Sequence, residues 1–134
     1  MGTWGVGTFE NDAAMDFAGS VTDGGGVAVL EGAFDRVLAV GGGYLEASDA
    51  QEALMAAEIV ARMKGRPGAP TTYLTEVEAW IAKAKPAASD KLIDKARRVV
   101  GRIVAAESEL VELWQESDEF EAWKADVDGV LARL

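Results

Sequence analysis

Carboxylates are the most plentiful side chains in this chain that could do chemistry. The sequence contains 23 Asp and Glu residues but no His and no Cys. It therefore lacks thiolate nucleophiles, imidazole bases and the usual ligands of zinc, copper and haem iron. An enzymatic function would have to rest on the acids alone. We expect no cofactor, and the composition favours a function other than catalysis.

One group of acids near the start of the chain could bind a metal ion. Oxygen ligands of the kind that Mg²⁺ and Ca²⁺ prefer come close together in sequence at Glu10, Asp12 and Asp16. Their spacing does not match a calcium-binding loop, and a first helical turn favours acids through the helix dipole without any ligand. Helix capping is therefore the competing interpretation of this group.

Glu58 is the acid most suited to general acid or base chemistry. It lies in an Ala-rich run that we expect to be buried, where desolvation could perturb a carboxyl group. Its partner would be Arg62, one helical turn further on, or the indole N–H of Trp4 or Trp80. A metal-dependent enzyme or sensor would thus use Glu10, Asp12, Asp16 or Glu58, whereas a solvent-facing or capped Glu58 would have no catalytic role.

A segment near the other end of the chain, residues 107–121, contains seven acids and no base. We call it the acidic segment; its acids are Glu107, Glu109, Glu112, Glu116, Asp118, Glu119 and Glu121. Acids near the C-terminal end of a long helix oppose the helix dipole and repel one another. Such a surface could dock a basic protein and make the association depend on salt. The alternative is a solvated surface that keeps the protein soluble.

The first twelve residues combine aromatic rings, glycines and a helix-start signal. Gly5 and Gly7 allow the backbone to turn tightly, so Trp4 and Phe9 can pack against the body of the protein. Asn11 or Asp12 can then cap a first helix. We call residues 1–12 the N-terminal clasp and expect it to be ordered. Its residues are Trp4, Gly5, Gly7, Phe9, Asn11 and Asp12.

The clasp resembles the start of a family of small bacterial proteins known as domain of unknown function 4259. Members typically begin with the pattern Met-Gly-x-Trp-Gly-x-Gly-x-Phe-x-Asn-Asp, which Met1, Gly2, Trp4, Gly5, Gly7, Phe9, Asn11 and Asp12 match. The resemblance extends to the stretch around Glu58 and fades over the last third of the chain. The resemblance implies a fold group, and it carries no particular activity over to this chain.

Apolar periodicity predicts helices along the rest of the chain. No window shows the alternation typical of a strand. The expected helices span residues 13–21, 27–40, 49–63, 75–85, 89–113 and 118–134. The third is apolar almost all round, so it should lie centrally.

Several helix ends carry capping signals. Asp49 and Thr75, each with a Glu three residues on, resemble capping boxes, and Ser89 can cap the following helix. From Leu92 to Leu113 that helix repeats apolar residues in a heptad seam. Self-association of two chains through this seam is a further alternative.

These elements predict an all-α fold, a compact single-domain bundle of five or six helices over residues 1–134. The domain would consist of the clasp, a family-like helical part (13–85), and a long charged helix with a C-terminal helix (86–134). The net charge of −10 opposes binding to nucleic acid. No signal peptide or membrane span is evident, so we expect a cytoplasmic protein that does not bind membranes.

The sequence therefore favours a non-enzymatic interaction protein that binds another, basic protein through its acidic segment. An immunity or antitoxin-like inhibitor of a basic target is the example that fits these features. The metal-dependent enzyme or sensor is the alternative.

Overall fold

The computed structural model describes residue 3 and residues 5–134, and this part of the chain is built from helices. They are α1 (Asp12–Ser20), the π-helix η1 (Val21–Gly25), α2 (Gly26–Val40), α3 (Ala47–Met63), α4 (Thr75–Ala84), α5 (Asp90–Ile103), α6 (Glu109–Gln115) and α7 (Phe120–Arg133). Because α1, η1 and α2 follow one another without a loop, the described residues form six separate helical segments. The all-α single domain expected from the sequence is confirmed. None of the helices in this part of the chain is long and apolar enough to cross a membrane.

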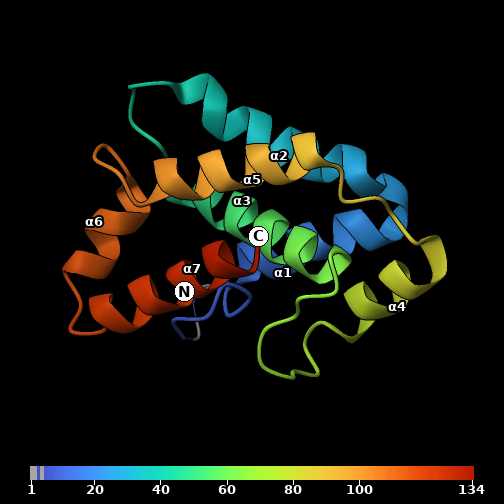
Figure 1. Ribbon diagram of the computed structural model, residues 1–134. Helices are drawn as coiled ribbons and strands as arrows, with labels where there is room; N and C mark the ends of the chain where they lie inside the picture. The colour runs from blue at the N-terminus through green and yellow to red at the C-terminus, as the bar shows by residue number, and fades with distance from the viewer. Residues whose placement is uncertain (1–2, 4) are drawn as a thin grey trace.

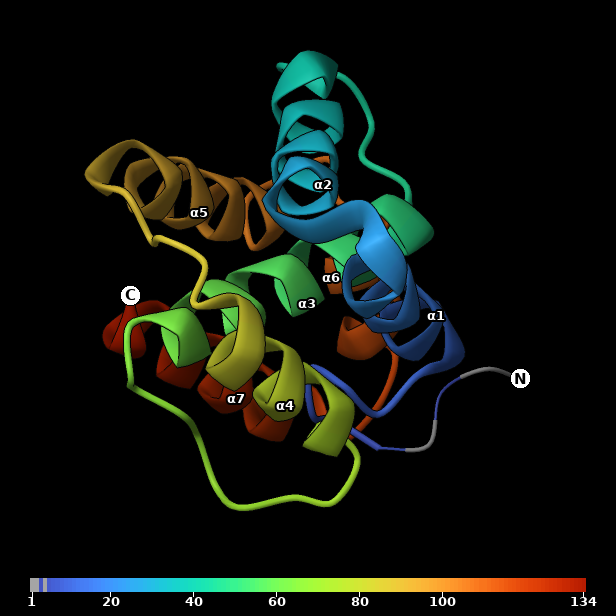
Figure 2. The same ribbon diagram turned by 90° about the vertical axis from the view of Figure 1, so that its right-hand side faces the viewer.

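Helix α3 lies at the centre of the bundle, with the other helices packed around it (Figures 1 and 2). Every residue from Ala53 to Arg62 is buried. The many Ala side chains of α3 are short, so its neighbours can approach closely on several sides. The central position predicted from its apolar circumference is confirmed.

Glycines mark the two connections on either side of α2. Gly24 and Gly26, with φ of 109° and 61°, turn the chain between α1 and α2, and Gly41, with φ of 58°, ends α2. These positive φ values are accessible to glycine at little cost. Gly24, Gly26 and Gly41 therefore act in the connections between helices.

Two of the expected side-chain caps are present. Asn11 accepts a hydrogen bond from the Ala14 N–H at the start of α1, and Ser89 accepts one from the Leu92 N–H at the start of α5. Both predictions are confirmed.

The two predicted capping boxes are wrong. Helix α3 begins at Ala47, ahead of Asp49, and the Ala47 N–H donates to the carboxylate of Glu109 over 2.8 Å. A distant acid therefore takes the place of the local cap. At α4, the Thr75 hydroxyl donates backwards to the Thr72 carbonyl and caps nothing.

The predicted long helix from residue 89 to residue 113 is also wrong. Helix α5 ends at Ile103, residues 104–108 form a connection, and α6 begins at Glu109. The heptad seam is thus interrupted, and Leu92, Val99 and Ile103 are buried in the chain's own core. They are not free to form a seam with a second chain, so self-association stays a prediction without this basis.

Candidate functional site

The acidic segment spans the end of the α5–α6 connection, all of α6, and the turn into α7. Its start is fixed to the connection between α2 and α3, because the Leu45 N–H donates to the Glu107 carbonyl over 2.8 Å. In return, the Glu109 N–H donates to the Leu45 carbonyl over 2.9 Å. This pairing holds Glu107 at a φ of 59°, a left-handed conformation that is unusual for a residue with a side chain. Two connections far apart in sequence thus position the first acids.

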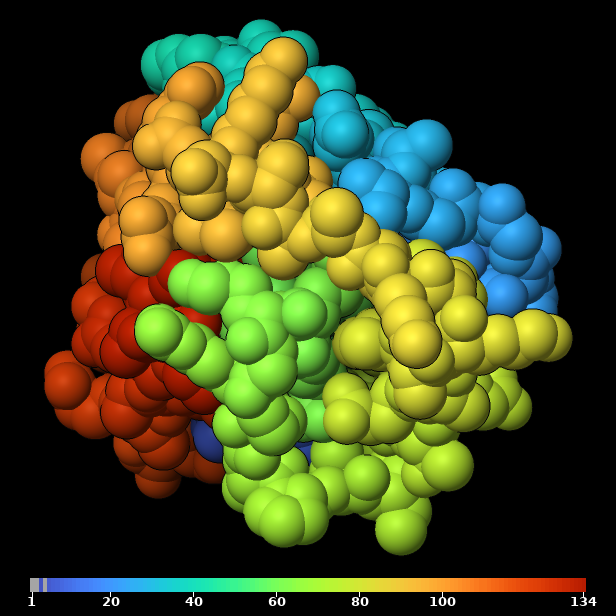
Figure 3. All heavy atoms as spheres, turned by 45° about the vertical axis from the view of Figure 1, so that its right-hand side comes forward, coloured from blue at the N-terminus to red at the C-terminus, as the bar shows by residue number. Residues whose placement is uncertain are grey.

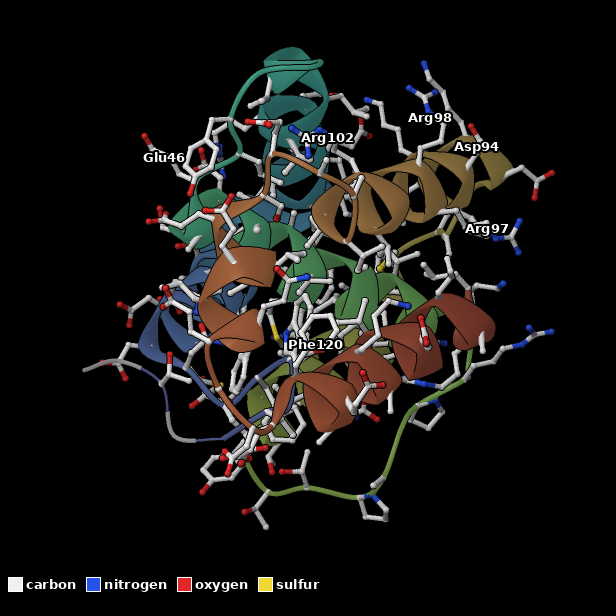
Figure 4. All side chains as sticks on the ribbon, turned by 90° about the vertical axis from the view of Figure 1, so that its left-hand side faces the viewer. Glu46, Asp94, Arg97, Arg98, Arg102 and Phe120 are labelled. Atoms are coloured by element: carbon white, nitrogen blue, oxygen red, sulfur yellow. The ribbon has the colours of Figure 1, made fainter. Side chains whose placement is uncertain are left out.

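Arg102, at the end of α5, crosslinks the same two connections. Its guanidinium donates to the carbonyls of Gly41 and Gly43 on one side and to those of Ala106 and Glu107 on the other. Figure 4 looks onto this side of the molecule, with Arg102 directed towards the connection that leads to Glu46, whereas Arg98 points away from the body. Arg102 is thus engaged with backbone oxygens.

The break in the predicted long helix changes the electrostatics of the acidic segment. Glu109 and Glu112 lie in the first turn of α6, and Glu121 lies in the first turn of α7. Acids in a first turn are stabilised by the helix dipole. The cost that the sequence suggested, acids opposing the dipole of one long helix, is therefore absent for these residues.

Two acids of the segment have uncharged partners. Glu109 accepts from the Ala47 N–H, and Glu112 accepts from the Tyr44 hydroxyl over 2.8 Å. The hydrogen bond to Glu112, followed by desolvation and the nearby charges of Glu112, Glu109 and Glu107, raises the pKa of Tyr44 to about 12. Three acids of the segment thus act together on one phenol.

The acidic segment carries unbalanced charge. Among the described residues, none of its seven acids forms a salt bridge. Glu107, Glu112, Glu116, Asp118, Glu119 and Glu121 are exposed, and Glu109 is half-buried. The 15 residues of the segment contain no Lys or Arg, so they contribute a charge of −7 to the chain's net charge of −10.

A groove opens beside α6, on the surface of the α5–α6 connection. It is lined by Val104, Ala105, Ala106, Glu107, Ser108, Val111, Glu112 and Gln115. Four of these lining residues are apolar, and the other four are two acids, one amide and one hydroxyl. Ser108 is 1% exposed, and its hydroxyl has no hydrogen-bond partner in the described part of the chain. A buried polar group without a partner is uncommon in folded proteins.

Glu58, the other candidate site residue, is buried and 3% exposed. Its Oε2 accepts from Arg62 Nε over 2.8 Å, which confirms the partner predicted within the helix. Arg133, near the end of α7, adds two more bonds, with Nη1 2.9 Å from Oε2 and Nη2 2.6 Å from Oε1. Hydrogen bonding to Glu58 raises the pKa of Arg133 despite its partial burial. A solvent-facing Glu58 is therefore excluded.

The Glu58 cluster, which consists of Glu58, Arg62 and Arg133, connects α3 and α7 with α4 and with the loop after α3. Arg62 also reaches Glu78 of α4 over 3.4 Å, and Arg133 donates to the carbonyl of Arg66 in the loop after α3. Figure 3 shows this loop emerging between α7 and α4. The two guanidinium groups make three hydrogen bonds to this carboxylate, which occupy most of its roughly four lone-pair sites. The arrangement suits a structural ion cluster that joins α3, α4 and α7.

The N-terminal clasp is fixed to α7. The N–H and the hydroxyl of Thr8 donate to Oδ2 of Asp126 over 2.9 and 2.8 Å. Burial raises the pKa of Asp126, although these two hydrogen bonds and the Arg133 charge oppose the increase. Phe9 packs on Tyr73 with ring centroids 5.7 Å apart. The clasp is thus tied to the fold by both polar and aromatic contacts.

The glycines of the clasp make room for Glu10. Its carboxylate accepts a hydrogen bond from the Gly7 N–H over 3.0 Å. A Cβ atom at Gly5 or Gly7 would come within 2.7 or 2.6 Å of a Glu10 carboxylate oxygen. These contacts are with the end of a flexible side chain, so the tight backbone turn expected at the two glycines stays a prediction. Trp4, Met1 and Gly2 lie outside the described residues, so the anchoring of Trp4 stays a prediction.

The acids assigned to the metal alternative are not gathered into one site. Glu10 turns back to the clasp backbone, Asp12 and Asp16 are exposed on α1, and Glu58 is held by arginines. In the part of the chain that the structure describes, no group of three or more acids is placed to hold a metal ion.

Sequence reasoning missed four residues that organise these sites: Tyr44, Arg102, Asp126 and Arg133. Asp126 had a usable signal, because it lies on the apolar stripe of α7 between Trp123 and Val130, where an acid needs a partner. Arg133 is separated from Glu58 by 75 positions, and no spacing rule connects them.

Fold and surface together define a small all-α domain with an unpaired acidic segment and a structural ion cluster. The family model described as a domain of unknown function (DUF4259) matches residues 2–126, and the chain belongs to that family. The match includes the whole acidic segment, so it extends further than the resemblance suggested. No curated protein and no solved structure matched the chain.

Proposed function

We propose that this protein is a non-enzymatic interaction domain that binds a basic surface of another protein. The observation that carries the proposal is the acidic segment, seven acids that form no salt bridge among the described residues. An immunity or antitoxin-like protein that neutralises a basic target is the type of activity that fits it. The proposal includes a cytoplasmic location, which cell fractionation would test.

Acids elsewhere in the chain support the proposal by contrast. Of the 16 acids outside the segment, seven are paired with Lys or Arg, whereas none of the seven inside it is paired among the described residues. The paired acids are Glu31, Asp35, Glu52, Glu58, Glu78, Asp94 and Asp128. Charge of one sign without intramolecular partners steers association with a surface of opposite sign and makes the rate depend on salt. The acidic segment is therefore the surface where a cationic partner would make the most favourable electrostatic interactions.

Two matched variants test the proposal. The segment variant combines Glu116→Gln, Glu119→Gln and Glu121→Gln. The control variant combines Asp16→Asn, Asp23→Asn and Glu76→Gln, which are exposed acids outside the segment. Both change the net charge equally, so a difference between them reports on position and not on total charge.

The experiment is affinity purification of each tagged protein from its native host at low and at high salt. We expect a protein partner that the parent and the control variant retain at low salt, that high salt releases, and that the segment variant retains poorly. Calorimetry with the purified partner would then give the salt dependence of the affinity. The proposal would be overturned if the retained amount of partner were the same at low and high salt and the same for the parent and the segment variant.

A further inference from the structure

We propose that the groove beside α6 is a binding site for a single basic side chain, arginine or lysine, of the protein partner. The inference rests on the proposed function and locates the contact within it. The groove is lined by the eight residues given above, from Val104 to Gln115. It lies at the N-terminal part of the acidic segment.

The lining matches both parts of a long cationic side chain. Val104, Ala105, Ala106 and Val111 supply apolar surface for an aliphatic stem. Glu107 and Glu112 supply carboxylates for the charged head group, and both are exposed. Lys and Arg commonly bury their stems along apolar surface while the charged end reaches polar groups. The pattern does not suit an apolar ligand, because two charges would be left beside it.

Ser108 gives a second, independent indication of a ligand. Its side chain is buried, it lines the groove, and its hydroxyl lacks a hydrogen-bond partner in the described part of the chain. A hydroxyl oxygen can accept from a guanidinium or an ammonium N–H. Leaving such a group unsatisfied in a buried position is costly, so a small shift of the groove wall that brings this hydroxyl to a donor on the occupant would be favoured.

The charges around the groove favour a cation over an anion. Glu107, Glu109 and Glu112 are all hydrogen-bonded to residues 44–47, so they lie close to one another. Their donors are the Leu45 N–H, the Ala47 N–H and the Tyr44 hydroxyl, respectively. Arg102 is the cation beside them, and its guanidinium is directed at the carbonyls of the two connections. Three acids against one cation leave the site negative. The position of Glu107 is itself fixed by the bond from the Leu45 N–H to its carbonyl.

The probe is arginine blocked at both ends, Nα-acetyl-arginine methylamide, titrated into the full chain and followed by the backbone amide resonances. Blocked citrulline, which has nearly the same shape but no charge, is the matched control ligand. Blocked lysine distinguishes the two cationic side chains. We expect saturable shifts confined to residues 104–115 and the Tyr44 region with arginine or lysine, and binding at least about tenfold weaker with citrulline.

Variants of the chain make the test specific to the groove. Glu107→Gln and Glu112→Gln should each weaken arginine binding by about tenfold, the equivalent of one charge-assisted hydrogen bond, and Ser108→Ala should weaken it by less. Glu116→Gln and Glu121→Gln, acids of the same segment that do not line the groove, should leave it nearly unchanged. The amide spectrum of each variant confirms that it is folded.

Absence of saturable shifts at residues 104–115, equal binding of citrulline, or equal loss in the Glu116→Gln and Glu107→Gln variants would each overturn the inference. Such a failure is distinguishable from failure of the proposed function. If the partner still binds in a manner that depends on salt and on the segment variant, only the groove is wrong. If partner binding depends neither on salt nor on the segment substitutions, the proposed function itself is wrong.

Discussion

At the scale of single residues, Glu58 carries its charge between two guanidinium groups in the interior of the fold. Replacing it by Ala would leave buried Arg62 and partly buried Arg133 without their carboxylate. Removing one partner of a buried pair typically costs about 3–5 kcal/mol. We expect Glu58→Ala to lower the free energy of unfolding by that amount, measured by urea denaturation.

The matched control is Glu52→Ala, on the same helix. Glu52 pairs with the exposed Arg36 over 3.0 Å, and such surface pairs contribute less than about 1 kcal/mol. Equal losses in the two variants would contradict a structural role of the Glu58 cluster. The sequence predicted half of this cluster, since Arg62 follows Glu58 by one turn. Arg133 could not be predicted, because only the fold brings α7 to α3.

Tyr44 provides a spectroscopic test of the charges around α6. Its pKa is raised to about 12, first by its hydrogen bond to Glu112. In a Tyr73→Phe background, where Tyr44 is the only tyrosine, the phenolate absorbance should therefore appear far above pH 10. Adding Glu112→Gln should shift this titration back towards the ordinary value of 10.0. A titration that Glu112→Gln leaves unchanged would show that the hydrogen bond is not the main cause.

At the scale of elements, Asp126 joins the N-terminal clasp to α7. Its pKa is raised by burial, so the ionised carboxylate is disfavoured in the fold. A raised carboxyl pKa adds stability below the pKa of the unfolded chain, and this stability is lost as the pH rises through the folded value. Asp126→Asn removes this loss and keeps an oxygen that can accept from Thr8.

We therefore expect Asp126→Asn to gain stability relative to the parent at neutral pH and to lose that advantage in acid. Asp126→Ala leaves the Thr8 N–H and hydroxyl without their acceptor, so it should lower stability by about 1–3 kcal/mol. Thermal unfolding across the pH range measures both. A constant difference between Asp126→Asn and the parent at every pH would contradict the assignment.

The break between α5 and α6 is the clearest case in which sequence periodicity failed. Residues 104–108 contain no Gly or Pro, and the apolar seam continues through them. Tertiary hydrogen bonds end α5. Leu45 pairs with residues 107 and 109, and Arg102 binds four backbone carbonyls. In the same way, α3 starts early because Glu109 supplies its cap. Local signals succeeded at Asn11 and Ser89, where cap and helix are contiguous.

The left-handed Glu107 tests this explanation directly. A non-glycine residue in that conformation costs about 1–2 kcal/mol. We expect Glu107→Gly to raise the free energy of unfolding by about 1 kcal/mol, measured by urea denaturation. Ala106→Gly, one residue earlier and without a positive φ, should be neutral or destabilising. If both substitutions had the same effect, the strain at residue 107 would not be real.

At the scale of the whole molecule, patterns among neighbours in sequence predicted more than could be predicted about contacts between distant residues. The all-α class and the central α3 follow from apolar periodicity, which depends on neighbours in sequence. The distribution of charge along the chain could also be predicted, because the acidic segment is one continuous stretch of the sequence. Which acids stay unpaired could not be predicted, since Glu31 and Asp35 pair with Lys95 on another helix, whereas no acid of the acidic segment forms a salt bridge among the described residues.

This uneven charge gives a prediction for the response of the whole molecule to salt. Unpaired like charges repel one another, and salt screens that repulsion over about 10 Å at 0.1 M ionic strength. The melting temperature of the parent should therefore rise with added NaCl. The segment variant (Glu116→Gln, Glu119→Gln and Glu121→Gln) should show a smaller rise than the control variant (Asp16→Asn, Asp23→Asn and Glu76→Gln), although their net charges are equal. Equal salt responses of the two variants would show that the acidic segment is not a concentrated source of repulsion.

MgCl₂ at the same ionic strength should raise the melting temperature no more than NaCl does, because the acids that could bind a metal are not gathered among the described residues. A larger increase in melting temperature with Mg²⁺ or Ca²⁺ than with NaCl would instead favour the metal-dependent alternative.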